Sequence, residues 1–261
     1  MKYYGAKNVQ VTLLLILLLI SIMGCTSKES YTRFSGTKNN QELENTSTSD
    51  KSNTEKIKSR KLRVWDLEVI NTGRDANYLN DLEKNVLLEM NKVRSNPQKY
   101  AELYLTELRS YYKGKELIYP DHFHKLTEEG VKAVDVCYDY LINKKSVDIL
   151  MPSERLCKAA GDHAIDQGKT GAVGHTGSDG SNPSDRINKY GKYMIVAAEN
   201  ISYGHNIARR IVLTLLVDDG VPSRGHRDNI MRDEFKYAGI AFGSHPEYRY
   251  ICVIDFVGDY K

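Results

Sequence analysis

The 261-residue chain contains only four cysteines, six prolines and one tryptophan, and its charges nearly balance. So few cysteines cannot frame a disulfide-dense secreted scaffold, and so little proline excludes collagen-like and proline-rich classes. A net charge of +3 lacks the basic excess that phosphate contacts require, so we expect no nucleic-acid partner. The length predicts one or two domains with a substantial hydrophobic core.

Sequence patterns that mark several well-known active sites are also missing. H-E-x-x-H, G-x-S-x-G, the P-loop and G-x-G-x-x-G do not occur, so no metalloprotease, serine-hydrolase or nucleotide site is indicated. The sequence alone does not decide whether the protein is an enzyme.

The first 24 residues predict an export signal. After a basic start, the apolar run from Val9 to Met23 is shorter than the roughly 20 residues that span a bilayer. Ile22-Met23-Gly24-Cys25 resembles a bacterial lipobox, in which cleavage precedes a lipidated cysteine. We therefore predict an exported lipoprotein of the bacterial envelope, anchored to a membrane through Cys25; the alternative is a signal anchor with an incidental cysteine. The absence of aspartate after that cysteine favours the outer membrane, where one exists.

The next segments predict a tether and a lead-in to the folded part. Ser, Thr and Asn supply 17 of the 35 residues in 26–60, so we expect residues 25–61 to be a disordered polar tether. Residues 62–79 contain RVWDLEVI, which is consistent with either a short strand or a docking segment. Residues 80–261 then form the main domain.

Hydrophobic periodicity in the main domain predicts helices first and strands later. Asn80 and Glu83 suit a capping box, and Pro97 suits the start of a second helix after the first has ended. The helices expected from the periodicity cover residues 82–96, 97–111, 124–143, 153–168, 185–190 and 207–217. The C-terminus alternates apolar and polar residues on both sides of SHPE, which indicates a β-hairpin. The fold class is therefore α+β.

Three polar clusters in loop-like sequence could carry chemistry. They are GHTGSDG around His175, AENISYG around Glu199 and SRGHRDNIM around His226. Their spacing in the chain allows them to converge in space but does not require it.

The same clusters resemble the three marks of the CAP superfamily, which includes cysteine-rich secretory, venom-allergen and pathogenesis-related proteins. Gly174-His175, Glu199-Asn200-Ile201 and Gly225-His226 stand in the family's order, and LLEMNKVRSNPQKYA is similar to its first helix. SRGHRDNIM and YICVIDFVG resemble the bacterial branch, here a lipoprotein branch. The resemblance spans about residues 80–261.

This resemblance implies an α-β-α sandwich with a central antiparallel sheet and a cleft with two histidines and two acidic residues. His175, Glu199 and His226 match three of the four, whereas the second acidic residue has no clean counterpart. Asp218 or Asp219 could replace it. Imidazole and carboxylate suit a divalent cation, most simply zinc. Glu199 could instead orient a histidine, or the histidines could be ordinary loop residues.

The resemblance leaves the activity open, and we favour a binding module over an enzyme because no residue is marked as an activated nucleophile and the second acidic residue has no clean counterpart. We expect the cleft to hold a lipid, glycan or protein ligand. The alternative is a metal-assisted, protease-like hydrolase with His175, Glu199 and His226 as candidate catalytic residues.

The sequence also predicts the surroundings of several cysteines, histidines and arginines. Cys137, Cys157 and Cys252 lie on apolar faces, which predicts small core residues rather than disulfides. We expect His163 to be a satisfied, partly buried residue and His205 to lie on the cleft rim. Arg186 and Arg227 are predicted to tie down carboxylates.

Overall fold

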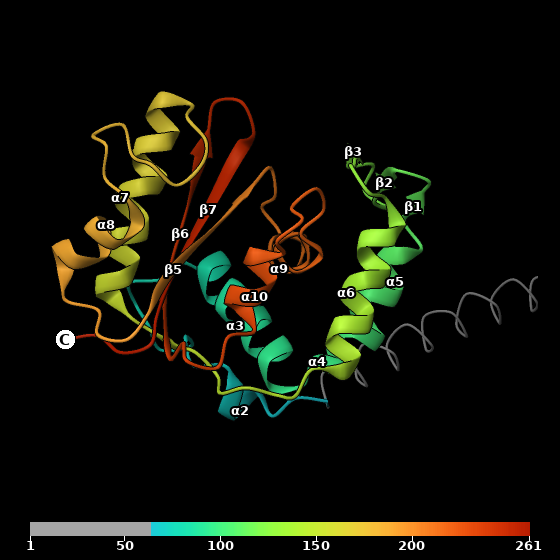
Figure 1. Cartoon of the computed structure of the whole chain (residues 1–261), viewed down its shortest axis with the longest axis horizontal. Helices are drawn as coiled ribbons and strands as arrows, with labels where there is room; N and C mark the ends of the chain where they lie inside the picture. The colour runs from blue at the N-terminus through green and yellow to red at the C-terminus, as the bar shows by residue number, and fades with distance from the viewer. Residues whose placement is uncertain (1–63) are drawn as a thin grey trace, which may run out of the picture. The chain divides into compact units, whose positions relative to one another are not determined.

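The computed structural model describes residues 64–261, shown in colour in Figure 1. The predicted signal segment 1–24 and tether 25–61 lie outside the described residues, as do the first two residues of the lead-in segment. The helical elements of the described part are α2 (Leu67–Ile70), α3 (Asp81–Ser95), α4 (Pro97–Tyr100), the π-helical η1 (Ala101–Leu105), α5 (Thr106–Arg109), α6 (Val131–Asn143), α7 (Glu154–Thr170), α8 (Pro183–Tyr190), α9 (Ala208–Val217) and α10 (Gly225–Ile230). Its strands are β1 (Tyr112–Lys113), β2 (Glu116–Ile118), β3 (His124–Leu126), β4 (Met151–Pro152), β5 (Ala197–Tyr203), β6 (Tyr237–His245) and β7 (Arg249–Val257).

A four-stranded sheet in the order β4-β6-β7-β5 forms the centre of the domain. β6 and β7 form the predicted C-terminal hairpin, with His245 opposite Arg249 next to the turn. β5 lies antiparallel to β7 along its whole length, whereas the two-residue β4 pairs in parallel with β6. The sheet is therefore antiparallel except at its β4 edge.

Helices cover both faces of this sheet, with α7 and α8 on one face and α3, α9 and α10 on the other (Figure 1). Side chains of β7 alternate between the two layers, as a strand requires. Ile251 and Val253 join the apolar cluster beneath α7, while Cys252 and Ile254 join the larger core shared with α3 and α9. The expected α-β-α sandwich is confirmed.

Close contact between α7 and β6 depends on Gly239. A Cβ at this position would lie 2.1 Å from the backbone carbon of Leu156 and 2.3 Å from the backbone nitrogen of Cys157. Only a glycine allows the helix to approach the strand this closely.

Helix α3 begins at the predicted capping box, in which the Asn80 side chain and the Glu83 carboxylate accept each other's backbone N–H at 3.0 and 2.9 Å. Near its end, the fully buried Arg94 donates to four backbone carbonyls, those of Asp148, Ile230, Arg232 and Phe235. Burial lowers the pKa of Arg94 to about 10. The arginine joins α3 to the chain between α10 and β6.

The lead-in segment docks on the core and contains no strand in its described part. Trp65 is 6% exposed, and its indole N–H donates to the Lys92 carbonyl at 2.9 Å. Its ring stacks on Tyr104 with centroids 6.0 Å apart. Of the two alternatives for RVWDLEVI, the docking segment is therefore found, with the single helical turn α2 following the tryptophan.

The predicted helix over residues 124–143 is wrong at its start. Residues 124–126 form β3, which pairs with β2 in a small three-stranded sheet, and the helix begins only at Val131. Gly130 adopts φ +70°, which interrupts a helix. The Asp219 carboxylate also accepts the backbone N–H groups of Glu128 and Glu129 at 2.7 and 2.8 Å, which holds this turn open.

Candidate functional site

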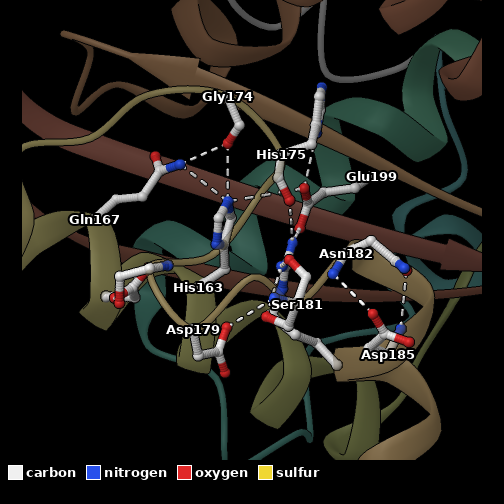
Figure 2. A network of polar contacts seen from close by, with 12 residues as sticks. His163, Gln167, Gly174, His175, Asp179, Ser181, Asn182, Asp185 and Glu199 are labelled. Atoms are coloured by element: carbon white, nitrogen blue, oxygen red, sulfur yellow. Dashed lines mark hydrogen bonds and ion pairs between the residues drawn. The ribbon is translucent and has the colours of Figure 1, made fainter.

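The residues singled out by the sequence come from separate elements along the edge strand β5. Glu199 is the third residue of β5, His175 lies in the loop between α7 and α8, and His226 is the second residue of α10. Figure 2 shows His175 and Glu199 next to each other, with His163 beside them on the α7 side. The fold therefore brings the first and second marks into direct contact.

Glu199 is held by two partners, one on each carboxylate oxygen. Its Oε1 accepts from His175 Nδ1 at 2.8 Å, and its Oε2 accepts from Arg186 Nη2 at 2.7 Å. The Glu199 side chain is 1% exposed, whereas that of His175 is 48% exposed. The buried carboxylate thus fixes one side of a histidine whose other side faces solvent. The prediction that Arg186 ties down a carboxylate is confirmed.

His226 is held in the same manner by Asp218. Asp218 Oδ1 accepts from His226 Nδ1 at 2.6 Å, and Oδ2 accepts the backbone N–H of His226 at 3.0 Å. Asp218 ends α9 in the left-handed conformation, with φ +56°, which turns its side chain back toward α10. Asp219 instead binds the turn at Glu128 and Glu129. The structure therefore places Asp218, and not its neighbour, beside the second histidine.

The two histidine rings face one another across a short gap. Their centroids are 6.5 Å apart and their planes are inclined by 34°. Because a carboxylate can only accept, each Nδ1 carries the proton and each Nε2 presents its lone pair. With Zn–N bonds of about 2.1 Å and near-tetrahedral angles, two imidazoles on one ion have ring centres about 5 Å apart, so the two rings would approach each other by about 1 Å on binding a cation.

These residues fit a divalent cation held by two imidazole nitrogens, with water completing its coordination. His175 and His226 would be the ligands, and Glu199 and Asp218 would orient them, because both oxygens of each carboxylate already accept hydrogen bonds. Within residues 64–261, no group of three or more His, Cys, Asp or Glu side chains is arranged to hold a metal ion. Zinc binding therefore stays a prediction. The predicted ligands are the two histidines, and the carboxylates orient them.

Asn200 links the second and third marks. Its side-chain amide donates to the His226 carbonyl at 3.0 Å, and its oxygen accepts from Asn229 at 2.9 Å. The position of α10, and hence of His226, depends on these contacts.

Two buried groups beside Glu199 were not predicted to belong to the site. Asp255 lies opposite Glu199 in the β5–β7 register and is fully buried. Neither of its oxygens has a hydrogen-bond partner among the described residues. Burial, and then the negative charge of Glu199, raise the pKa of Asp255 well above its ordinary value. A protonated Asp255 can donate to Glu199, as an ionised one cannot.

His163 is the other buried group. It is fully buried on α7, and its Nε2 lies 2.9 Å from the Gly174 carbonyl and 4.0 Å from Glu199 Oε1. Its contact with Gly174 positions the loop that carries His175 (Figure 2). The sequence predicts a satisfied, partly buried histidine, but the residue is completely enclosed and its Nδ1 has no partner in the described part.

A cavity of about 510 Å³ opens beside His226 and Asp218. It is bounded by the end of β5, the end of α9, β3 and the turn between β6 and β7. His205 lines it and is 4% exposed, so this residue belongs to the wall rather than to an exposed rim.

Two remaining expectations have different outcomes. Arg227 binds no carboxylate among the described residues; it donates to the carbonyls of Leu216 and Val217 at 2.5 and 3.0 Å, which corrects the prediction. The cysteines Cys137, Cys157 and Cys252 are free, and burial raises the pKa of each thiol above its ordinary value. They are core residues, as predicted, with Cys157 the least enclosed.

A search for membrane-spanning helices within residues 64–261 finds none that is long and apolar enough.

Comparisons with known proteins identify one family. The model of the cysteine-rich secretory protein family, CAP, matches residues 67–256. The match includes all of the marks described above and part of the lead-in segment. No curated protein matches the chain.

Two solved structures are similar to the chain. An outer surface protein from Borrelia burgdorferi is 22% identical, with a TM-score of 0.38 over 50% of this chain and 88% of its own. An extracellular protein containing a SCP domain, from Bacillus anthracis str. Ames, is 20% identical, with a TM-score of 0.35 over 42% of this chain and 34% of its own.

Proposed function

Since the chain belongs to the CAP family of cysteine-rich secretory proteins, we propose that it is a ligand-binding module of the bacterial cell envelope with a divalent-cation site at the cavity. The observation that carries this proposal is the pair of histidines held by carboxylates. Among residues 64–261, the Nε2 atoms of His175 and His226 have no hydrogen-bond partner, and the two ring centroids are 6.5 Å apart. His226 also lines the 510 Å³ cavity, so a cation at the pair would stand next to a bound ligand.

A cation held there would act as a Lewis acid toward a ligand oxygen or a water molecule. The chain's own residues orient the two histidines for such a cation. Glu199 and Asp218 keep each proton on Nδ1, and Arg186 keeps the Glu199 carboxylate in place. Such second-layer carboxylates fix the tautomer and the orientation of the histidines that they contact.

Calorimetric titration of zinc tests this proposal. The protein would be the chain from residue 25 with Cys25→Ser, so that lipid does not complicate the measurement. We expect about one equivalent of zinc to bind, and binding to be lost in His175→Ala/His226→Ala. The exposed His122 offers a matched control, because His122→Asn should bind zinc like the parent. Absence of binding in the parent, or unchanged binding in the double variant, would contradict the cation site.

The envelope location rests on the lipobox-like sequence that ends at Cys25. We expect the chain expressed in a bacterium to incorporate labelled palmitate and to fractionate with membranes. Cys25→Ser should abolish the label and release the protein from the membrane fraction. Label that persists in the variant would exclude this cysteine as the anchor.

A metal-assisted hydrolase remains the second candidate, favoured by one observation. His175 is 48% exposed and backed by a buried carboxylate; with a cation on His226 alone, the Nε2 of His175 would be the general base toward a water molecule on that cation. If the protein hydrolyses peptides, His175→Ala should abolish turnover while the fold survives. A zinc-loaded protein without turnover on a peptide panel would favour the binding module.

A further inference from the structure

The cavity contains a polar region that the histidine pair does not use. Ser202 and His205 both line it, at and just after the end of β5. Both are more than nine-tenths buried, with 4% exposure each. Ser202 follows Asn200 by two residues and so faces the same side of the strand, toward α10 and the cavity.

Neither side chain has a hydrogen-bond partner within the described part of the chain. The Ser202 hydroxyl is buried and unpaired. His205 makes only ring contacts, with Phe123 at 4.7 Å and Tyr119 at 6.5 Å between centroids. Buried polar groups in native proteins nearly always have a partner, so the unpaired Ser202 hydroxyl, with His205 beside it on the same cavity, points to a ligand that supplies one.

The charge around His205 favours a negatively charged ligand group. Burial lowers the pKa of His205 to about 4, and the positive charges of Lys125 and Arg210 lower it as well. The ring is therefore neutral at pH 7 and offers one donor and one acceptor. Arg210 is paired with Asp121 at 2.9 Å, whereas Lys125 lines the cavity and forms no ion pair with any residue of 64–261.

The cavity also contains aromatic rings, while its carboxylates, those of Asp218, Asp219 and Glu247, line it beside His226 and the β6–β7 turn. Phe123 lies against His205, and Tyr203 and Tyr248 stand 5.2 Å apart between centroids. Such rings provide a large contact area for an apolar or aromatic group. A ligand that suits both features has a charged head and an aromatic or apolar body.

We infer that the His205 end of the cavity is a subsite for the carboxylate of a ligand with an aromatic or apolar body. His205 and Ser202 hydrogen-bond the carboxylate, Lys125 pairs with its charge, and the rings of Phe123, Tyr203 and Tyr248 contact the body. This subsite deepens the proposed ligand-binding function and rests on it. It needs no cation, because none of its residues belongs to the histidine pair.

A pair of probes that differ only in the carboxylate tests the inference. N-acetyl-L-phenylalanine and N-acetyl-L-phenylalaninamide would be titrated into the ¹⁵N-labelled chain from residue 25, with Cys25→Ser and a chelator present. We expect the acid to bind at least tenfold more tightly than the amide. Its largest amide shifts should fall on residues 123–125 and 202–205.

Three variants locate the interaction. Lys125→Met and His205→Phe should each reduce the affinity for the acid at least fivefold and leave that for the amide unchanged, while Ser202→Ala should have a smaller effect of the same kind. The phenylalanine preserves the ring contacts of His205. Lys169→Met, which removes an exposed lysine on α7, should change neither affinity.

Failure of the acid to bind, equal binding of acid and amide, or a preference that survives both Lys125→Met and His205→Phe would overturn the subsite. The zinc titration described above tests the proposed cation site independently, so failure of the subsite can be distinguished from failure of the proposed function. If zinc binds at the histidine pair and the acid does not bind, only the carboxylate subsite fails.

Discussion

Single residues around Glu199 show how one carboxylate is kept charged inside the protein. Arg186 donates to one oxygen and His175 to the other, at 2.7 and 2.8 Å. The neighbouring Asp255 has no such donors and is fully buried. Two ionised carboxylates side by side in a buried strand pair would repel strongly, so the proton resides on Asp255.

The high pKa of Asp255 makes stability depend on pH in a defined direction. The folded state binds a proton at a higher pH than the unfolded state does, since burial and Glu199 raise the folded pKa. The stability that this group contributes is therefore complete below the unfolded pKa, near 4, and is lost as pH rises through the folded value. Asp255→Asn keeps a hydrogen-bond donor and removes the titration.

We predict that Asp255→Asn raises the Tm relative to the parent by a few degrees at pH 8 and by less at pH 4. Thermal unfolding followed by circular dichroism at both pH values measures the two differences. A variant that is less stable than the parent, with a larger loss at pH 8 than at pH 4, would show that Asp255 is ionised and needed in that form.

The sequence predicts some of the site residues and misses others. His175, Glu199 and His226 were found through their local motifs. The choice between Asp218 and Asp219 depends on the left-handed conformation at Asp218, which adjacent residues of identical chemistry do not reveal. Asp255 was not singled out, because the alternation of apolar and polar residues along the C-terminal strand does not show that β5 and α7 enclose it.

Elements were predicted well where periodicity and caps agreed. The capping box at Asn80 and the alternation of β6 and β7 each correspond to an observed element. The helix assigned to residues 124–143 began too early, because its first residues pair with β2 and are held by a carboxylate 90 residues further along the chain. Long-range contacts of this kind leave no local signal.

Packing between elements leads to a prediction at Gly239. A Cβ there would overlap the backbone of α7, which lies 2.1 Å away at Leu156. We predict that Gly239→Ala destabilises the domain by about 3 kcal/mol or more, because backbone on both sides must move. Urea unfolding measures the loss.

Gly243 on the same strand provides the control for this prediction. A Cβ there would meet Ile251 Cγ2 at 3.8 Å, an ordinary contact. Gly243→Ala should therefore change the free energy of unfolding by less than about 1 kcal/mol. Equal losses in the two variants would indicate that strand flexibility, rather than the approach of α7, makes glycine necessary.

At the scale of the whole molecule, a three-layer domain presents the histidine pair and the cavity on one side of an edge strand. The sandwich was predicted from the resemblance and is confirmed by the observed layers. Composition indicated a signal segment and a tether, but these lie outside the described residues and stay predictions. The cavity could not be predicted, since its walls come from four elements that are distant in the chain.

The central claim is that carboxylates orient two histidines for a cation, and adjacent aspartates allow a direct test. Zinc affinity would be measured by calorimetry for Asp218→Asn and Asp219→Asn. Asp218 holds His226 Nδ1, whereas Asp219 holds only the turn at residues 128–129. We predict that Asp218→Asn weakens zinc binding 10- to 100-fold, as loss of an orienting carboxylate does, and that Asp219→Asn leaves it unchanged. Equal affinities in the two variants would contradict the account.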